Sequence, residues 1–446
     1  MIRASIAVLV LQSIVSIARA DDDEATSDKV RQLMSEAEAA GSAVSARVKR
    51  FDLGAGSVLW ICGGVPYGPG AIVAIDHDAD WTASGTVTAR IAPAAIAAAL
   101  NGPVSSTRMP DHHYLGTGNA LGAQFVVSGM DDDEVRTRLL ALLEQLSSPR
   151  IGAHDVAEAR DLFSPPDVDE IGGQVPARRA LLRRLYPTAP AGFEAEPFEL
   201  GAIAAELDVH KVTAWVKRWR EGYARIVVVG GFDDGEADRI AAAVRAKVHD
   251  WNLRGPVAVS GAPVAAPPQR VVDRLKGPWK TFSALAFGQV VPRPDAHTER
   301  VWELLQPVMQ ARVEARLKRD RLARFVIVRV RRIGESLLVD GLVLLTTGSD
   351  PGAADAAVRD ALGTLVNRGP TAAELVDAKL SAIRAHAPDP RGVVEATALL
   401  TERYSEGVAI ARELAGVRRS EAAAALRALD PKKLTTTVAG DAPARR

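Results

Sequence analysis

The sequence has one cysteine, no excess charge and few aromatic residues, and each shortage excludes a class of protein. A single Cys among 446 residues excludes a disulfide-built scaffold and any zinc or iron–sulfur site made of cysteines. Lysine plus arginine equals aspartate plus glutamate at 55 each, so the whole chain is not a general binder of polyanions. Aromatic residues make up 5% of the chain and do not interleave with the basic ones, which argues against nucleic-acid binding.

What is present is the composition of a globular protein. Hydrophobic residues account for 47% and charged residues for 25% of the chain. At about 100–200 residues per domain, the length predicts two to four domains. Cys62 ends an apolar run, 58–62, so we expect it to be a small buried hydrophobic residue.

The first twenty residues have the pattern of a secretory signal peptide. Arg3 gives a positive start, an apolar run covers 4–17, and Ala18-Arg19-Ala20 fits the small-x-small cleavage rule. The run is short for a membrane span, and no other stretch reaches 18 uninterrupted apolar residues. We therefore expect a soluble mature protein, periplasmic or secreted, with no transmembrane segment beyond the signal peptide; a retained N-terminal anchor is the alternative. Losing Arg3 and Arg19 leaves 53 basic against 55 acidic residues, a net charge of −2.

The rest of the chain has the same order of elements twice. The first series is a hairpin at 48–61, a strand at 71–75, a short helix at 93–100, a strand at 124–130, a helix after Asp131, a helix at 209–223 and a buried strand at 224–231. The second series is a strand at 281–287, a helix at 296–324, strands at 325–330 and 337–345, helices at 353–367, 371 onward, 395–417 and 420–429, and a strand at 435–441. Val227-Val228-Val229-Gly230 and Thr437-Val438-Ala439-Gly440 end the two series alike.

This repetition predicts an α+β protein duplicated in halves of about 200 residues. The predicted boundaries are a signal peptide at 1–20, a leader helix or linker at 21–46, a first half at 47–252, a Pro/Gly/Ala-rich linker at 253–269, a second half at 270–441 and a tail at 442–446.

Three segments carry a resemblance to a known family. They are the strand and acid at 223–233, the run Leu185-Tyr186-Pro187 followed by 201–219, and the helix start at 367–379 with its Gly-x-Thr-x-x-Glu-Leu-x-x-Ala-Lys pattern. Their order resembles the M16 (insulinase, pitrilysin and mitochondrial-processing-peptidase-like) family over about 48–441. The resemblance implies tandem M16-like (LuxS/MPP-like) α/β sandwich domains and a zinc metalloendopeptidase ancestry.

The family's chemistry requires His-x-x-Glu-His on a helix, with a further Glu downstream. Two His four residues apart share a helical face and hold one Zn²⁺, and the Glu between them acts as general base on the metal-bound water. None of the eight histidines begins or ends such a motif. The helix at the expected position, 90–100, contains no His or Glu. We therefore predict no catalytic and no metal-binding residues, and no zinc cofactor; the substrate-binding residues stay unassigned.

A second departure lies in the later half. Family members often carry an Arg and a Tyr there that bind the substrate carbonyl. The matching run is 317–325, where Lys318 replaces the Arg and Phe325 replaces the Tyr; Arg319, one position along, is an alternative cation.

Other polar clusters offer rival sites. If 76–80 were a strand, Asp76, Asp78 and Asp80 would share a face and could bind a hard cation; the alternative is a solvated acidic turn after a strand. The His112-His113 pair is either a metal donor or a polar loop. His154 and Glu158, four apart on a helix, form a pair typical of a protein surface.

Residues 312–332 are strongly basic, with eight Arg and one Lys against Glu314 and Asp320, a local charge of +7. They form either a surface for anions or an acidic partner, or the solvated side of a helix and strand edge.

These observations favour an exported M16 peptidase-like protein without catalysis. Its predicted role is that of a partner or regulatory subunit of an active M16 zinc peptidase, bound through apolar faces of the second half, with a peptide as a further possible ligand. One alternative is an active zinc metallopeptidase with rearranged ligands such as His77, His112 and His113. The other is a periplasmic module that binds peptides or anions.

Overall fold

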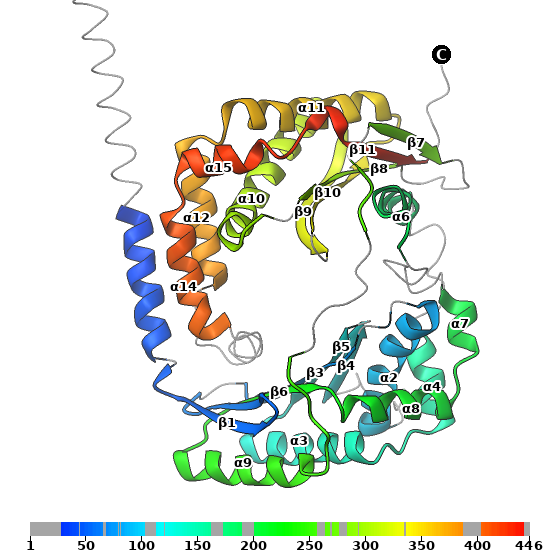
Figure 1. Cartoon of the computed structure of the whole chain (residues 1–446), viewed down its shortest axis with the longest axis vertical. Helices are drawn as coiled ribbons and strands as arrows, with labels where there is room; N and C mark the ends of the chain where they lie inside the picture. The colour runs from blue at the N-terminus through cyan, green and yellow to red at the C-terminus, as the bar shows by residue number, and fades with distance from the viewer. Residues whose placement is uncertain are drawn as a thin grey trace, which may run out of the picture.

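The computed structural model describes residues 28–440 apart from 44, 66–67, 79, 81, 103–112, 120, 162–172, 190–199, 257–263, 268–269, 276–282, 293, 334–335 and 387–402. The predicted signal peptide (1–20) and tail (442–446) lie outside the described residues. Two sheets with their helices form two halves, one above the other in Figure 1.

The first half is built on a six-stranded mixed sheet in the order β1-β2-β6-β3-β5-β4. Strands β2 and β6 are parallel and every other neighbouring pair is antiparallel. The strands are β1 (Val48–Gly54), β2 (Ser57–Cys62), β3 (Gly70–Asp76), β4 (Tyr114–Asn119), β5 (Gly122–Ser128) and β6 (Tyr223–Val229).

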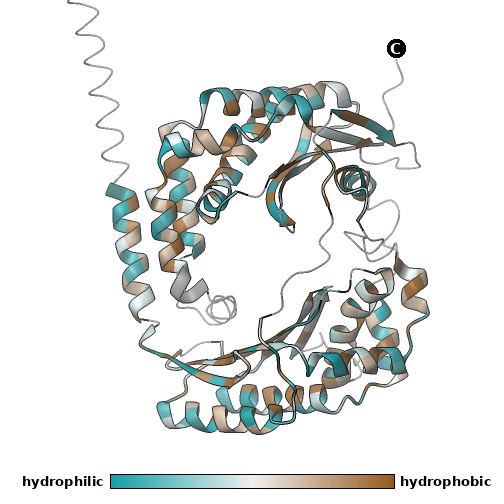
Figure 2. Ribbon diagram, viewed as in Figure 1, coloured by the Kyte–Doolittle hydropathy of each residue, from teal (hydrophilic) through white to brown (hydrophobic). Residues whose placement is uncertain are grey.

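Helices cover one face of this sheet and enclose the larger core of the first half. They are α2 (Ala83–Asn101), α3 (Asp132–Ser147), α4 (Ala153–Arg160), α7 (Gly201–Ala205), α8 (Val209–Trp219) and α9 (Asp234–Val248). In Figure 2 these helices carry both hydrophilic and hydrophobic residues, as expected for helices with one buried face. Cys62 is fully buried, as expected.

The second half is built on a five-stranded sheet in the order β7-β11-β8-β10-β9. Its strands are β7 (Val271–Leu275), β8 (Ala284–Pro292), β9 (Ala323–Ile333), β10 (Ser336–Leu345) and β11 (Thr435–Ala439). Its helices are α10 (Ala296–Arg319), α11 (Pro351–Arg368), α12 (Ala372–His386), α14 (Arg403–Gly416) and α15 (Arg419–Leu426), with a 3₁₀ turn at Pro431–Lys433.

The predicted duplication is confirmed by strand order. Strands β2-β6-β3-β5-β4 and β7-β11-β8-β10-β9 have the same order, and each begins with its only parallel pair. Helices α2 and α10 occupy equivalent places, after β3 and β8. Each contains an interior proline 23 residues after the start of the preceding strand, from Gly70 to Pro93 and from Ala284 to Pro307.

Two helices connect the halves. Helix α6 (Gln174–Leu185) precedes β6 in the sequence, yet its Ala177, Leu181 and Leu185 pack on the second sheet against Ala286 and Leu338.

The helical segment 28–43, inside the predicted leader, packs Val30, Met34 and Ala37 against α12 and α14. Arg412 of α14 also pairs with Glu38 at 2.7 Å. Two helices that precede strands of the first half in the sequence therefore pack on the second half.

Several element boundaries differ from the sequence-based ones. Helix α2 begins ten residues before the predicted start at 93, because the Thr82 hydroxyl accepts the Gly85 N–H and caps it, while Pro93 lies inside the helix. Helix α10 ends at Arg319 rather than 324, because Arg321 takes a left-handed conformation with φ 55°.

Strands β4 and β7 were not predicted, since β4 contains two glycines and β7 two charged residues. Among the described helices, α2 alone is long and apolar enough to cross a membrane by composition, with mean hydropathy 1.3, but 67% of that window is buried in the fold.

Candidate functional site

Helix α2 stands where the resemblance places the zinc motif, and its residues do not fit a zinc ion. The helix contains no His, Cys, Asp or Glu, and Zn²⁺ binds to nitrogen, thiolate or carboxylate oxygen. Among the described residues no group of three His, Cys, Asp or Glu side chains lies close enough to hold a metal. Zinc-dependent steps therefore have no ligands on this helix.

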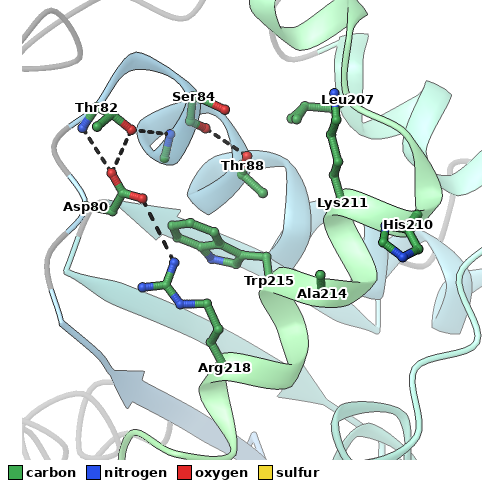
Figure 3. Close-up of a pocket in the computed structure, with 11 residues that line it drawn as sticks. Asp80, Thr82, Ser84, Thr88, Leu207, His210, Lys211, Ala214, Trp215 and Arg218 are labelled. Atoms are coloured by element: carbon green, nitrogen blue, oxygen red, sulfur yellow. Dashed lines mark hydrogen bonds and ion pairs between the residues drawn. The ribbon is translucent and has the colours of Figure 1, made fainter.

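A hollow of about 510 Å³ opens instead between the first half of α2 and helix α8 (Figure 3). We call it the α2–α8 hollow. It is lined by Asp80, Thr82, Ser84, Gly85, Thr88, Leu207, His210, Lys211, Ala214, Trp215 and Arg218.

The α2 side of the hollow is built around a carboxylate. Oδ1 of Asp80 accepts hydrogen bonds from the Thr82 backbone N–H at 3.1 Å and from the Thr82 hydroxyl at 2.7 Å. Gly85 leaves room for this carboxylate, because a Cβ there would lie 2.2 Å from Asp80 Cγ. The negative charge sits at the amino end of α2, where the helix dipole stabilises it.

The α8 side is cationic and aromatic. Trp215 is 7% exposed, and the Arg218 guanidinium lies 4.5 Å from the centre of its indole ring. The same guanidinium is 3.9 Å from Oδ2 of Asp80, a loose ion pair (Figure 3). Lys211 lies two turns earlier on α8 and donates from Nζ to the Glu206 carbonyl at 2.9 Å.

Several buried polar atoms of His77, α2 and α8 have no hydrogen-bond partner. His77 Nδ1 donates to the Asp78 carbonyl at 2.8 Å, which leaves Nε2 as a buried acceptor, and the ring meets Trp215 edge-on at 5.4 Å. Burial lowers the pKa of His77, with Arg218 acting in the same direction, so the ring is neutral. Nε2 of His77, Oγ1 of Thr86 and the indole nitrogens of Trp215 and Trp219 are buried without a hydrogen-bond partner. Buried polar atoms without a hydrogen-bond partner are rare in folded proteins.

The acidic run at 76–80 does not form a cation site. The strand ends at Asp76, so the three carboxylates do not share one strand face, and the condition for the cation-site alternative is not met. Each carboxylate instead faces a different arginine: Asp76 pairs with Arg225 at 2.8 Å and Asp78 with Arg254 at 3.6 Å. Since these arginines neutralise the run, the acidic-turn alternative describes it better.

The other histidine candidates are not brought together either. His112 lies outside the described residues, and neither His77 nor His113 belongs to a metal-binding group within the described part of the chain. His154 and Glu158 form a surface pair, 3.9 Å apart with the imidazole 72% exposed, as expected.

The run at 317–325 ends on the free edge of the second sheet. Phe325 lies on β9 and is 51% exposed. Lys318 forms an ion pair with Glu314 one turn away on α10. Phe325 has no hydrogen-bond donor, and the ammonium of Lys318 is engaged by Glu314.

The basic stretch 312–332 is largely neutralised by its neighbours. At least five of its nine cations have carboxylate partners: Arg312 with Glu374, Arg316 with Asp320 and Asp360, Lys318 with Glu314, Arg319 with Asp320, and Arg331 with Asp340. This pairing favours the structural alternative over an anion-binding surface.

Sequence reasoning missed the lining of the α2–α8 hollow. The spacing of Val212, Trp215, Val216 and Trp219 predicts the buried face of α8, and those four residues are indeed buried. The cations that flank this stripe, Lys211 and Arg218, lie on the same helix, but only the approach of α2 turns them into the wall of a hollow.

Solved structures of M16 peptidases have a similar fold. No protein-family model and no curated protein matches the sequence. The inactive domain of an M16 peptidase from Pseudomonas fluorescens matches with TM-score 0.68 and 15% identity, over 90% of this chain and 99% of that one. The first half of the periplasmic protease PqqL from Escherichia coli matches with TM-score 0.60 and 14% identity, over 88% of this chain and 92% of that one. In the complete PqqL chain the match spans 47% of the length. The chain has the M16 peptidase fold, as the sequence resemblance predicted.

Proposed function

We propose that this chain is an exported, non-catalytic M16-type subunit that binds an active M16 zinc peptidase and supports or regulates it. The observation that carries the proposal is the chemistry of α2, which has the place of the zinc helix but no side chain able to bind zinc. The α2–α8 hollow beside this helix contains the ion pair formed by Asp80 and Arg218.

Two further observations support a partner role. One solved neighbour with this fold is itself described as an inactive M16 domain. The complete PqqL chain is about twice as long as the part that this chain matches, which leaves room in that protein for a second unit of similar size. The leader at 1–20 supports export, the compartment in which PqqL is described.

Phe325 is the best candidate for the partner contact in the second half. It is an aromatic side chain, half exposed, on an edge strand, and exposed aromatic residues are frequent anchors of protein interfaces. Met130 is a matched control, since it is 87% exposed but lies in the first half.

The test is co-expression of the mature chain, 21–446, with the catalytic M16 peptidase of the same organism, followed by affinity capture and size-exclusion chromatography. We expect a one-to-one complex that Phe325→Ser weakens at least tenfold and Met130→Ser leaves unchanged. Failure of the mature chain to bind that peptidase would refute the partner role.

A further inference from the structure

We propose that the helix at 28–43 is a releasable clasp between the two halves, and that the halves move apart about α6 when this helix undocks. The 28–43 helix leads into β1 of the first half and packs on α12 and α14 of the second. In Figure 1 it lies on the opposite side of the molecule from α6, the other helix that crosses between the halves. The clasp is independent of any peptidase partner.

The 28–43 helix and β1 are additions to the duplicated fold. The repeat aligns β2-β6-β3-β5-β4 with β7-β11-β8-β10-β9, so among the described strands β1 has no counterpart in the second sheet. The buried residues of the helix belong to a cluster with α12 and α14 and not to the larger core of the first half. Its contacts therefore connect the two repeats rather than complete the core of the repeat that follows it.

The contact between the 28–43 helix and the second half is narrow. Val30, Met34 and Ala37 form one stripe at helical spacing, and each is 3–8% exposed. Their neighbours on α12 and α14 are aliphatic: Val376, Leu380, Ile383, Ala411 and Ala415. Arg412 and Glu38 form an ion pair between side chains that are 67% and 44% exposed, and exposed ion pairs stabilise little. Since most helical stability comes from the packing of an apolar face, undocking should also unfold the helix.

Helix α6 is the stronger of the two connections. Its Leu181, Leu182 and Leu185 belong to the core cluster formed with β8, β10 and β11. The Thr437 hydroxyl of β11 also donates a buried hydrogen bond to the Ala177 carbonyl. Because α6 takes part in the packing of the second sheet and the 28–43 helix does not, the halves should separate at the 28–43 helix and turn about α6.

The joint between the 28–43 helix and β1 is bonded on both sides. The Ala46 N–H donates to the Ser42 carbonyl at 3.1 Å, within the last turn of helical chain. The Gly63 N–H donates to the Arg47 carbonyl at 3.1 Å, and the Arg47 guanidinium donates to the Gly64 carbonyl at 3.4 Å. A docked helix therefore fixes the first sheet relative to α12 and α14.

The experiment measures the distance between the halves by double electron–electron resonance in the mature full chain. Spin labels are attached at Arg239→Cys on α9 and Ala409→Cys on α14, two exposed positions, while Cys62 is fully buried and stays unlabelled. Val30→Asp/Met34→Asp places two charges in the buried stripe. Gln32→Asp/Ser35→Asp is the matched control, because it adds the same charge to the exposed face of the same helix.

We expect Val30→Asp/Met34→Asp to shift the distance distribution to longer values and to broaden it, and the control to leave it unchanged. Amide exchange over 28–43 should become faster in the first variant only, while both sheets keep their protection. If both sheets lose protection as well, Val30→Ala/Met34→Ala replaces the Asp pair and should give a smaller shift in the same direction.

Three results would overturn the clasp. They are faster exchange over 28–43 with an unchanged distance distribution, an equal shift in the control, or exchange over 28–43 that neither pair of substitutions in the stripe alters. Loss of peptidase binding would leave these measurements unaffected, so the clasp and the proposed partner role stand or fall separately.

Discussion

The packing of Asp80 over α2 makes a prediction that runs against ordinary helix propensity. Replacing a helical glycine by alanine stabilises a helix by up to about 1 kcal/mol where there is space. Gly363 in α11 has such space, because a Cβ there would meet nothing within 4 Å. Gly85 does not, because its Cβ would lie 2.2–2.5 Å from three atoms of the Asp80 carboxyl group. The same substitution should therefore have opposite signs at the two positions.

The size of the effect follows from the bonds that Asp80 would lose. Gly85→Ala displaces the carboxylate from the Thr82 N–H and hydroxyl, two hydrogen bonds to a charged acceptor. The Asp80 side chain is 27% exposed, so we take each bond at about 1–1.5 kcal/mol, the upper part of the range for an ordinary hydrogen bond. Against a propensity gain of about 1 kcal/mol, Gly85→Ala should lose about 1–2 kcal/mol. Gly363→Ala should gain about 0.5–1 kcal/mol.

Urea unfolding followed by circular dichroism measures both values, and amide exchange over 83–101 and 351–368 localises them. We expect faster exchange in α2 for Gly85→Ala and slower exchange in α11 for Gly363→Ala. Equal stabilisation by both substitutions would refute the placement of Asp80 above Gly85.

Three more predictions concern other contacts. Arg359→Met leaves Asp355, 8% exposed, buried without its ion-pair partner, so unfolding by urea should show a loss of about 3–5 kcal/mol, partly recovered by adding Asp355→Leu. Burial lowers the pKa of His77, so the unfolded chain takes up the proton at a higher pH than the folded chain does. As the pH drops below about 6.5, the free energy of unfolding should therefore decrease, by at most about 1.4 kcal/mol per pH unit. His77→Gln should make this decrease smaller. The Gln310 side chain of α10 bonds the edge backbone of β9 at Val326 O and Val328 N, so Gln310→Leu should cost about 1–2 kcal/mol and increase self-association in light scattering.

The duplicated fold was accessible from the sequence because local patterns specify it. The buried strand β6 contains the apolar run 226–229. Thr371 and Glu374 form a capping box at the start of α12, with each backbone N–H bonded to the other's side chain. The strand β4 could not be predicted from the sequence, because Gly116 and Gly118 have no side chains to show an alternating pattern. Glycine is required at both positions because α2 packs closely on β4: a Cβ atom at either position would lie 2.0–2.1 Å from a carbonyl oxygen of α2.

The candidate site could be predicted only by what it lacks. A missing His-x-x-Glu-His motif is visible in the sequence, but the hollow joins Asp80 to Arg218, 138 positions apart, and no local pattern links them. The sequence left both a cation site and an acidic turn open for 76–80, because the arginines that neutralise the run, Arg225 and Arg254, are distant in the sequence.

The central claim is that a protein with the M16 fold has no zinc chemistry, and zinc stoichiometry tests it most directly. The mature chain is dialysed against trace zinc, its metal content is measured by elemental analysis, and the same sample is assayed on a mixture of peptides with and without chelator. The account predicts substoichiometric zinc and intact peptides. One zinc per chain together with chelator-sensitive cleavage would contradict it, and would mean that ligands outside α2 form the metal site.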